Sequence, residues 1–252
     1  MNDKVLIAVG CASLIAASAL GGWLLSRALK TKKYKKSPLH LSDGFTYTAH
    51  TGCVNTKDNS LDSIDAAVQY GADIVEIDLN FTADGQPVLS HDDPVGGEVS
   101  IDEAFEKISK CDGLKVNVDV KNTANLRAVV NAAEKHGITD RFFYTGITEE
   151  FVDAVKRDTP EVTYYLNVPV KKRQTDAYLQ SLVEKVRNSG AVGINFNKDN
   201  ATQKLVDLFH ENNMLVSIWT VNDEPDIYRI LSLSPDNITT RRPDRIQKII
   251  QK

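Results

Sequence analysis

Two carboxylates and an imidazole lie within one short apolar stretch of the sequence, Ile74–Asp92. Its first half is rich in apolar and β-branched residues, which is typical of a buried strand. Glu76 and Asp78 are two positions apart in it, so both side chains point to the same face. Buried acids are costly unless they are paired or bind a metal, and carboxylate oxygens suit hard divalent cations. With His91 nearby, the pattern predicts a divalent-metal site with a general acid or base beside it.

The position of His91 relative to the two acids depends on the turn between them. Asp84 and Gly85 form the dipeptide that type I′ hairpin turns favour, because both central residues of that turn need a positive φ. If these two residues form the turn, Asp78 lies directly opposite His91 on the returning strand. The alternative is a solvated strand face that carries an unrelated histidine.

The elements that must position these residues follow a regular order. Short apolar strands alternate with amphipathic helices, giving eight strand–helix units in about 210 residues. This order predicts an α/β protein with a compact (β/α)8 TIM barrel and a β-hairpin after strand two. An open doubly wound sheet is the alternative, but no glycine-rich dinucleotide fingerprint follows the first strand. The predicted barrel strands span residues 45–49, 74–81, 114–120, 141–145, 162–167, 192–196, 215–220 and 237–240.

Polar residues fall at the ends of several of these strands. His50 follows the first, Asp119 and Lys121 end the third, and Trp219 ends the seventh. Active residues of a TIM barrel lie at the C-terminal ends of its strands, so we expect these side chains to share one site. A lone histidine or tryptophan is often a core residue, but the acids at neighbouring strand ends favour a catalytic interpretation.

Charge is unevenly distributed along the chain. Residues 1–36 carry seven Lys or Arg against one Asp, a net charge of +6, and residues 37–252 carry 23 against 33, a net charge of −10. The strongly negative charge of residues 37–252 argues against nucleic-acid binding. The three scattered cysteines match neither a disulfide framework nor a zinc pattern. Nothing in the sequence indicates an oligomeric state.

The N-terminal segment differs from the rest. Val5–Leu25 is an apolar run of 21 residues without a charge, a length that predicts a transmembrane helix. Six basic residues follow in the ten positions from Arg27, and the positive-inside rule then favours a cytoplasmic catalytic domain. An anchor with the domain outside is the alternative. The sequence thus predicts a single-pass membrane protein, with an anchor and basic juxtamembrane segment over residues 1–36 and a barrel over residues 37–252.

The polar residues belong to an ordered series of short motifs. They are His50-Thr51-Gly52, Asp58-Asn59-Ser60, Glu76-Ile77-Asp78, Asp84-Gly85, His91-Asp92, Asp119-Val120-Lys121, Trp219-Thr220-Val221-Asn222 and, near the end, Thr239-Thr240-Arg241-Arg242-Pro243-Asp244. The series resembles the glycerophosphodiester phosphodiesterase family. The typical pattern of that family is His-Arg-Gly, Glu-Asn-Thr, Glu-x-Asp, Lys/Asp-Gly, His-Asp-Pro, acid-x-Lys, Trp-Thr-Val-Asn and Thr-Asp-Arg-Pro-Asp. The resemblance covers nearly all of residues 45–252, and the ordered set is more specific than any single motif.

The resemblance implies a phosphoric diester hydrolase with the TIM-barrel fold. Its substrate is a glycerophosphodiester or a lysophospholipid, which it hydrolyses to an alcohol and glycerol phosphate. The implied metal ligands are Glu76, Asp78 and Asp119, whose oxygens suit Ca²⁺ or Mg²⁺ and argue against zinc. The implied acid–base pair is His50 and His91, one accepting a proton from the attacking oxygen and the other protonating the leaving alkoxide.

The resemblance also implies two substrate-binding residues. Lys121 and the metal would offset the negative charge that accumulates on the transferring oxygens, and Trp219 would form an apolar wall of the pocket. One phosphate contact is missing, because Thr51 stands where the family has Arg. Lys121, Arg241 and Arg242 are the candidates to replace that cation.

Two alternatives to this function remain from the sequence. The Asp119-x-Lys121 form also occurs in sphingomyelinase D-like phospholipases, which act on choline lipids, and so favours a related enzyme with the same site. The missing Arg at position 51 favours a non-catalytic barrel that binds a phosphorylated ligand. Retention of both histidines and all three acids argues against the second alternative.

Overall fold

The protein folds as an α/β barrel in the computed structural model, which describes residues 26, 29, 34, 39 and 41–251. Eight parallel strands pair in a ring that closes between the first strand and the second, as the sequence predicts. The strands are β1 (Thr46–Ala49), β2 (Ile74–Phe81), β4 (Lys115–Val120), β5 (Phe142–Ile147), β6 (Tyr164–Asn167), β7 (Gly193–Asn197), β8 (Leu215–Trp219) and β9 (Asn237–Thr240).

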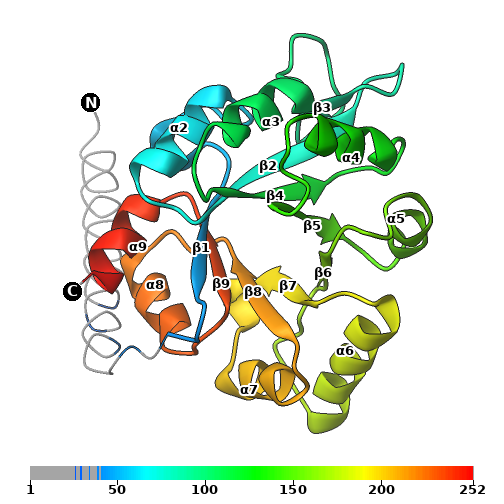
Figure 1. The fold of residues 1–252 in the computed structure, drawn as a ribbon. Coiled ribbons are helices and arrows are strands. Elements are labelled where there is room, and N and C mark those ends of the chain that lie inside the picture. The colour runs from blue at the N-terminus through cyan, green and yellow to red at the C-terminus, as the bar shows by residue number, and fades with distance from the viewer. Residues whose placement is uncertain (1–25, 27–28, 30–33, 35–38, 40, 252) are drawn as a thin grey trace, which may run out of the picture.

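Helices surround this ring of strands, as Figure 1 shows. Ser60 and Ser100 cap the first two, and the Ser100 cap is a capping box with Glu103. Two short 3-10 turns, η1 (Cys53–Asn55) and η2 (Lys198–Asn200), follow β1 and β7. The helices are α2 (Leu61–Gln69), α3 (Ile101–Ser109), α4 (Leu126–Lys135), α5 (Val152–Asp158), α6 (Asp176–Ser189), α7 (Gln203–Glu211), α8 (Glu224–Leu231) and α9 (Pro243–Ile250).

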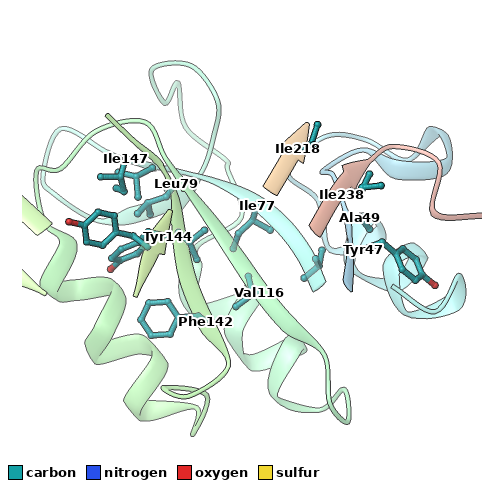
Figure 2. Packing of buried hydrophobic residues seen from close by; sticks show 14 of the residues in the cluster. Tyr47, Ala49, Ile77, Leu79, Val116, Phe142, Tyr144, Ile147, Ile218 and Ile238 are labelled. Atoms are coloured by element: carbon teal, nitrogen blue, oxygen red, sulfur yellow. The ribbon is translucent and has the colours of Figure 1, made fainter. Parts of the chain in front are cut away.

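Alternation along the strands separates the hydrophobic core from the site. Successive side chains of a strand point to opposite faces. On β2, Ile77 and Leu79 join the buried hydrophobic cluster that Figure 2 shows, whereas Glu76 and Asp78 point to the other face and line a cavity. The same alternation on β4 directs Val118 into the core and Asp119 into the cavity. The apolar shell therefore fixes the strands whose polar faces carry the site.

The hairpin after β2 forms, but its predicted register is wrong by one residue. The returning strand is β3 (Pro87–Leu89), and Leu79 pairs with Leu89. Only Gly85 of the turn dipeptide has a positive φ, of 80°, so the type I′ turn does not form. Instead Gly85 N–H donates to the carbonyl of Thr82 (2.8 Å) and closes a three-residue loop. This extra residue places Ser90, rather than His91, beside Asp78, with a Ser90 N–H to Asp78 carbonyl distance of 3.1 Å.

The prediction of a single-pass membrane location is wrong for the part of the chain that the structure describes. No helix there is long and apolar enough to cross a bilayer. The longest, α6, has 14 residues and an amphipathic sequence, whereas a spanning helix needs about 20 apolar residues. The predicted spanning segment, Val5–Leu25, lies outside the described residues.

Candidate active site

A cavity of about 410 Å³ opens where the barrel strands end. All seven residues that the sequence singles out for a site line it, although they come from five separate segments of the chain. Its wall comprises His50, Asp58, Glu76, Asp78, His91, Asn117, Asp119, Lys121, Thr145, Asn167, Asn195, Trp219, Thr220, Thr239 and Arg241. The roles of these residues stay predictions, and the structure gives their geometry.

Three carboxylates form the acidic centre of the cavity. Glu76 and Asp78 come from β2, and the parallel pairing of β2 with β4 sets Asp119 beside Asp78. One oxygen from each carboxylate lies within 4.8 Å of the others, and no second such group occurs among the described residues. Glu76 and Asp78 are buried and Asp119 is half-buried. An all-oxygen set at this spacing fits a hard cation such as Ca²⁺ or Mg²⁺.

The three acids differ in how they bear their charge. Burial raises the pKa of Glu76 well above its usual range, and repulsion from Asp78 and Asp119 raises it further. Burial also acts to raise the pKa of Asp78, but Lys121 and Asn59 together outweigh that effect and lower it. The buried Glu76 carboxylate therefore has too little positive charge around it to offset its own negative charge. A divalent cation at this point would supply it.

Lys121 lies between two of the three acids. Its Nζ is 2.8 Å from Oδ1 of Asp78 and 2.6 Å from Oδ2 of Asp119. Burial alone would lower the lysine pKa, but the two carboxylates outweigh burial and raise it. Lys121 thus stays protonated, and its charge is already shared with the acidic centre.

His50 directly follows β1 and lies next to the acidic centre. Its Nδ1 is 3.0 Å from the carbonyl oxygen of Thr51 and 3.5 Å from Oε2 of Glu76. A carbonyl only accepts hydrogen bonds, so Nδ1 carries a hydrogen and the neutral ring has its lone pair on Nε2. Burial lowers the His50 pKa, which favours this neutral form near neutral pH.

His91 occupies a different setting. It follows β3 at the edge of the cavity, and 68% of its side chain is exposed. Its Nδ1 is 2.9 Å from Oδ1 of Asp92, an exposed carboxylate. The sequence prediction that His91 faces Asp78 directly is wrong in register, because the hairpin loop is one residue longer. His91 nevertheless reaches the cavity, from the side of the hairpin.

Trp219 lies at the end of β8 and forms part of the cavity wall, where the sequence places it. Its indole Nε1 is buried and has no hydrogen-bond partner in the described part of the chain. The residue thus contributes an apolar part of the cavity wall, whereas its Nε1 is buried away from the cavity space.

The residues that hold the acids in place were not predicted from the sequence. Asn59 accepts from Asp78 N–H (3.1 Å) and donates to its Oδ2 (2.9 Å). Thr145 of β5 donates to an oxygen of Asp119, with an Oγ1–Oδ1 distance of 2.6 Å. Thr51 N–H donates to Oε2 of Glu76 at 2.8 Å. Asn59 belongs to one of the motifs that carry the family resemblance. For Thr145, the only sequence feature that pointed to the site was its position near the end of a predicted strand.

Known proteins share this fold and sequence pattern. Residues 45–117 and 96–245 match the Glycerophosphoryl diester phosphodiesterase family. A glycerophosphodiester phosphodiesterase of Caldanaerobacter subterraneus subsp. tengcongensis is 26% identical over 238 residues, which cover 81% of this chain and 97% of that protein. The enzyme of the same name from Bacillus altitudinis is 22% identical over 240 residues, covering 80% and 96%.

Solved structures agree with the sequence relatives. A phosphodiesterase of Oleispira antarctica, solved in complex with the product sn-glycerol-3-phosphate, superposes with a TM-score of 0.70 at 21% identity, covering 82% of this chain and 97% of that one. A glycerophosphoryl diester phosphodiesterase structure from Silicibacter pomeroyi also gives a TM-score of 0.70, at 16% identity, covering 83% and 94%. Since the family match spans most of the chain, this protein belongs to the glycerophosphoryl diester phosphodiesterase family and is a phosphoric diester hydrolase.

Proposed function

We propose that this protein is a metal-dependent phosphodiesterase that hydrolyses glycerophosphodiesters or lysophospholipids to an alcohol and glycerol phosphate, which keeps its acyl chain when the substrate is a lysophospholipid. The proposal rests on one observation: two histidines and a centre of three carboxylates line the same cavity. In the cleavage of an anionic diester, an acid–base pair transfers the protons and a bound cation offsets the negative charge.

Glu76, Asp78 and Asp119 would hold the metal ion, and their oxygen-only set suits Ca²⁺ or Mg²⁺. The raised pKa of Glu76, caused by burial and then by its two acidic neighbours, supports a site that is completed by a cation. When bound, the ion would withdraw charge from the phosphate oxygens as a Lewis acid. Lys121, held by two of these acids, would add to the positive charge near the phosphate.

His50 is the proposed general base. Its Nδ1 bonds to a backbone carbonyl, so Nε2 is the nitrogen that accepts a proton from the attacking oxygen. That oxygen belongs to water or to a hydroxyl of the substrate itself. The half-buried ring lies beside Glu76, whose carboxylate would stabilise the imidazolium that forms.

His91 is the proposed general acid. It reaches the cavity from the hairpin, away from the strand end that carries His50, so the two rings approach the phosphate from different segments. Its proton passes to the leaving alkoxide as the phosphorus–oxygen bond breaks. The proton taken by His50 and the one given by His91 balance over the reaction. Trp219 would pack against the carbon skeleton of the substrate.

The sphingomyelinase D-like activity is a second candidate, because Asp119 and Lys121 lie together in the cavity. A substrate panel separates the two candidates. The full chain is assayed on glycerophosphocholine, glycerophosphoethanolamine, lysophosphatidylcholine and sphingomyelin, with Ca²⁺, with Mg²⁺ and with EDTA. We expect metal-dependent release of the alcohol from the glycerophosphodiesters. Activity on sphingomyelin alone would favour the second candidate, and full activity in EDTA would contradict the metal assignment.

A further inference from the structure

Arg241 and Asp58 form an ion pair in the wall of the cavity. Nη1 of Arg241 lies 2.5 Å from Oδ1 of Asp58, and Nη2 lies 3.3 Å from Oδ2. Arg241 follows β9 and Asp58 lies in the segment after β1, and these two strands are neighbours in the ring. The two side chains are 37% and 54% exposed, so an entering ligand reaches this pair from solvent.

The backbone around this pair is fixed. The N–H of Arg241 donates to Oδ1 of Asn222 at 2.8 Å, and its carbonyl accepts from Val54 N–H at 3.0 Å. The side chains pack over Gly52, where a Cβ would collide with the Asp58 carboxylate and lie 2.6 Å from Nη1 of Arg241. The guanidinium is therefore held against the loop that carries His50.

The structure discriminates among the three cations that the sequence offers for phosphate binding. Lys121 is shared between Asp78 and Asp119 in the acidic centre. Arg242 binds the carboxylate of Asp244 through two hydrogen bonds of 2.8 and 2.7 Å and is not among the residues that line the cavity in the described part of the chain. Arg241 lines the cavity, and its partner there is an exposed carboxylate.

Position 51 cannot supply the missing charge. Thr51 is buried, and its Oγ1 accepts from the backbone N–H of Asn59 at 2.6 Å. When the closing motif is aligned on Arg242-Pro243-Asp244, Arg241 stands where the resembling pattern has Asp. A cation absent after β1 is thus present at the end of the adjacent strand, β9.

We propose that Arg241 binds the phosphate group of the substrate and that Asp58 holds its guanidinium at the edge of the cavity, an inference that rests on the proposed phosphodiesterase function. Asp58 accepts from the two Nη atoms, and a guanidinium has five N–H donors, so further donors remain for the non-bridging phosphate oxygens. The charge of Arg241 also acts on His50, where after burial it helps to lower the imidazole pKa.

The test measures binding of sn-glycerol 3-phosphate to the full-length protein by calorimetry, with glycerol as the phosphate-free control ligand. Arg241→Gln should weaken sn-glycerol 3-phosphate binding by about tenfold to a hundredfold, the usual range for a charge-assisted hydrogen bond. Asp58→Asn should weaken binding less, by about threefold, because Arg241 is still present but loses the carboxylate that holds its guanidinium. Arg242→Gln, which removes the adjacent ion pair outside the cavity, is the matched control and should bind like the parent.

Two results would overturn the proposal. One is parental affinity in Arg241→Gln. The other is an equal loss in Asp58→Asn and Arg241→Gln, since the pair would then act only by holding the loop. If Arg241-dependent binding is found but the parent hydrolyses no glycerophosphodiester, the proposed function fails while the phosphate-binding role of Arg241 stands.

Discussion

The imidazole of His50 lies beside the carboxylate of Glu76, with 3.5 Å between Nδ1 and Oε2. The proposed base and a proposed metal ligand are therefore direct neighbours. Glu76 also accepts the backbone N–H of Thr51, the residue after His50, at 2.8 Å. One buried carboxylate thus connects the cation site with the strand end that carries the base.

Glu76→Gln should have opposite effects with and without metal. Loss of a ligand should weaken Ca²⁺ or Mg²⁺ binding by about tenfold or more, measured by calorimetry. The pKa of Glu76 is raised by burial and by its acidic neighbours, so the metal-free folded state loses stability as pH rises above the unfolded pKa of this group. A neutral glutamine removes that loss, and we expect a higher melting temperature at pH 7 than for the metal-free parent. Asp62→Asn, at an exposed acid on α2, is the control.

Thr145→Val tests the support of Asp119. The valine keeps the shape of the side chain but removes the hydroxyl, which lies 2.6 Å from Oδ1 of Asp119 and 2.8 Å from Oδ1 of Asn117. Groups that orient metal ligands typically contribute tenfold to a hundredfold to affinity, so metal binding should weaken by about that factor. Thr148→Val, whose hydroxyl bonds to the exposed Glu150 at 3.2 Å, should leave metal affinity unchanged. Equal affinities in the two variants would show that Asp119 needs no help from β5.

The dependence of kcat/KM on pH should be bell-shaped in the metal-bound enzyme. Burial lowers the pKa of His50, and a bound cation would lower it further. The midpoint of the acidic limb should therefore lie at a pH below the ordinary histidine pKa of about 6.5. Activity is then lost as pH falls through that limb, because the protonated ring accepts no proton. His91→Ala should lower kcat/KM across the profile, and an unchanged kcat/KM in that variant would contradict its role as the acid.

Much of the fold was predictable because its pattern is local. Strand alternation and helix periodicity are set by neighbouring residues, and they gave the order of the eight strand–helix units and the acidic pairs on β2 and β4. The hairpin register was not predictable from Asp84-Gly85 alone. The Thr82 hydroxyl bonds to Gln86 N–H (3.0 Å) and to Asp84 (2.5 Å), which favours a longer loop.

Long-range pairs were the least predictable part of the site. Asp58 and Arg241 are 183 positions apart, and only closure of the ring between β9 and β1 brings them together. Their contact depends on the side chains of two loops, which no periodicity encodes. The support of Asp119 by Thr145 depends in the same way on the pairing of β4 with β5.

We also propose that residues 37–252 fold as one unit without the first 36. Tyr34 packs against the core, so its loss removes some apolar contact, of order 1 to 3 kcal/mol for a large side chain. Deletion of residues 1–36 should leave an active protein with a slightly lower melting temperature. Tyr34→Ala in the full chain should lower the melting temperature by a similar amount. Loss of the folded state on deletion, followed by circular dichroism, would contradict this boundary.

The most direct test of the account is hydrolysis of a glycerophosphodiester by His50→Ala and His91→Ala at saturating metal. Each substitution should lower the rate about a hundredfold or more, the usual contribution of a general acid or base. Metal affinity, measured on the same samples, should stay within about threefold of the parent, because neither ring is a proposed ligand. Near-parental hydrolysis by either variant would refute the acid–base pair, and loss of the metal would instead make that histidine a ligand.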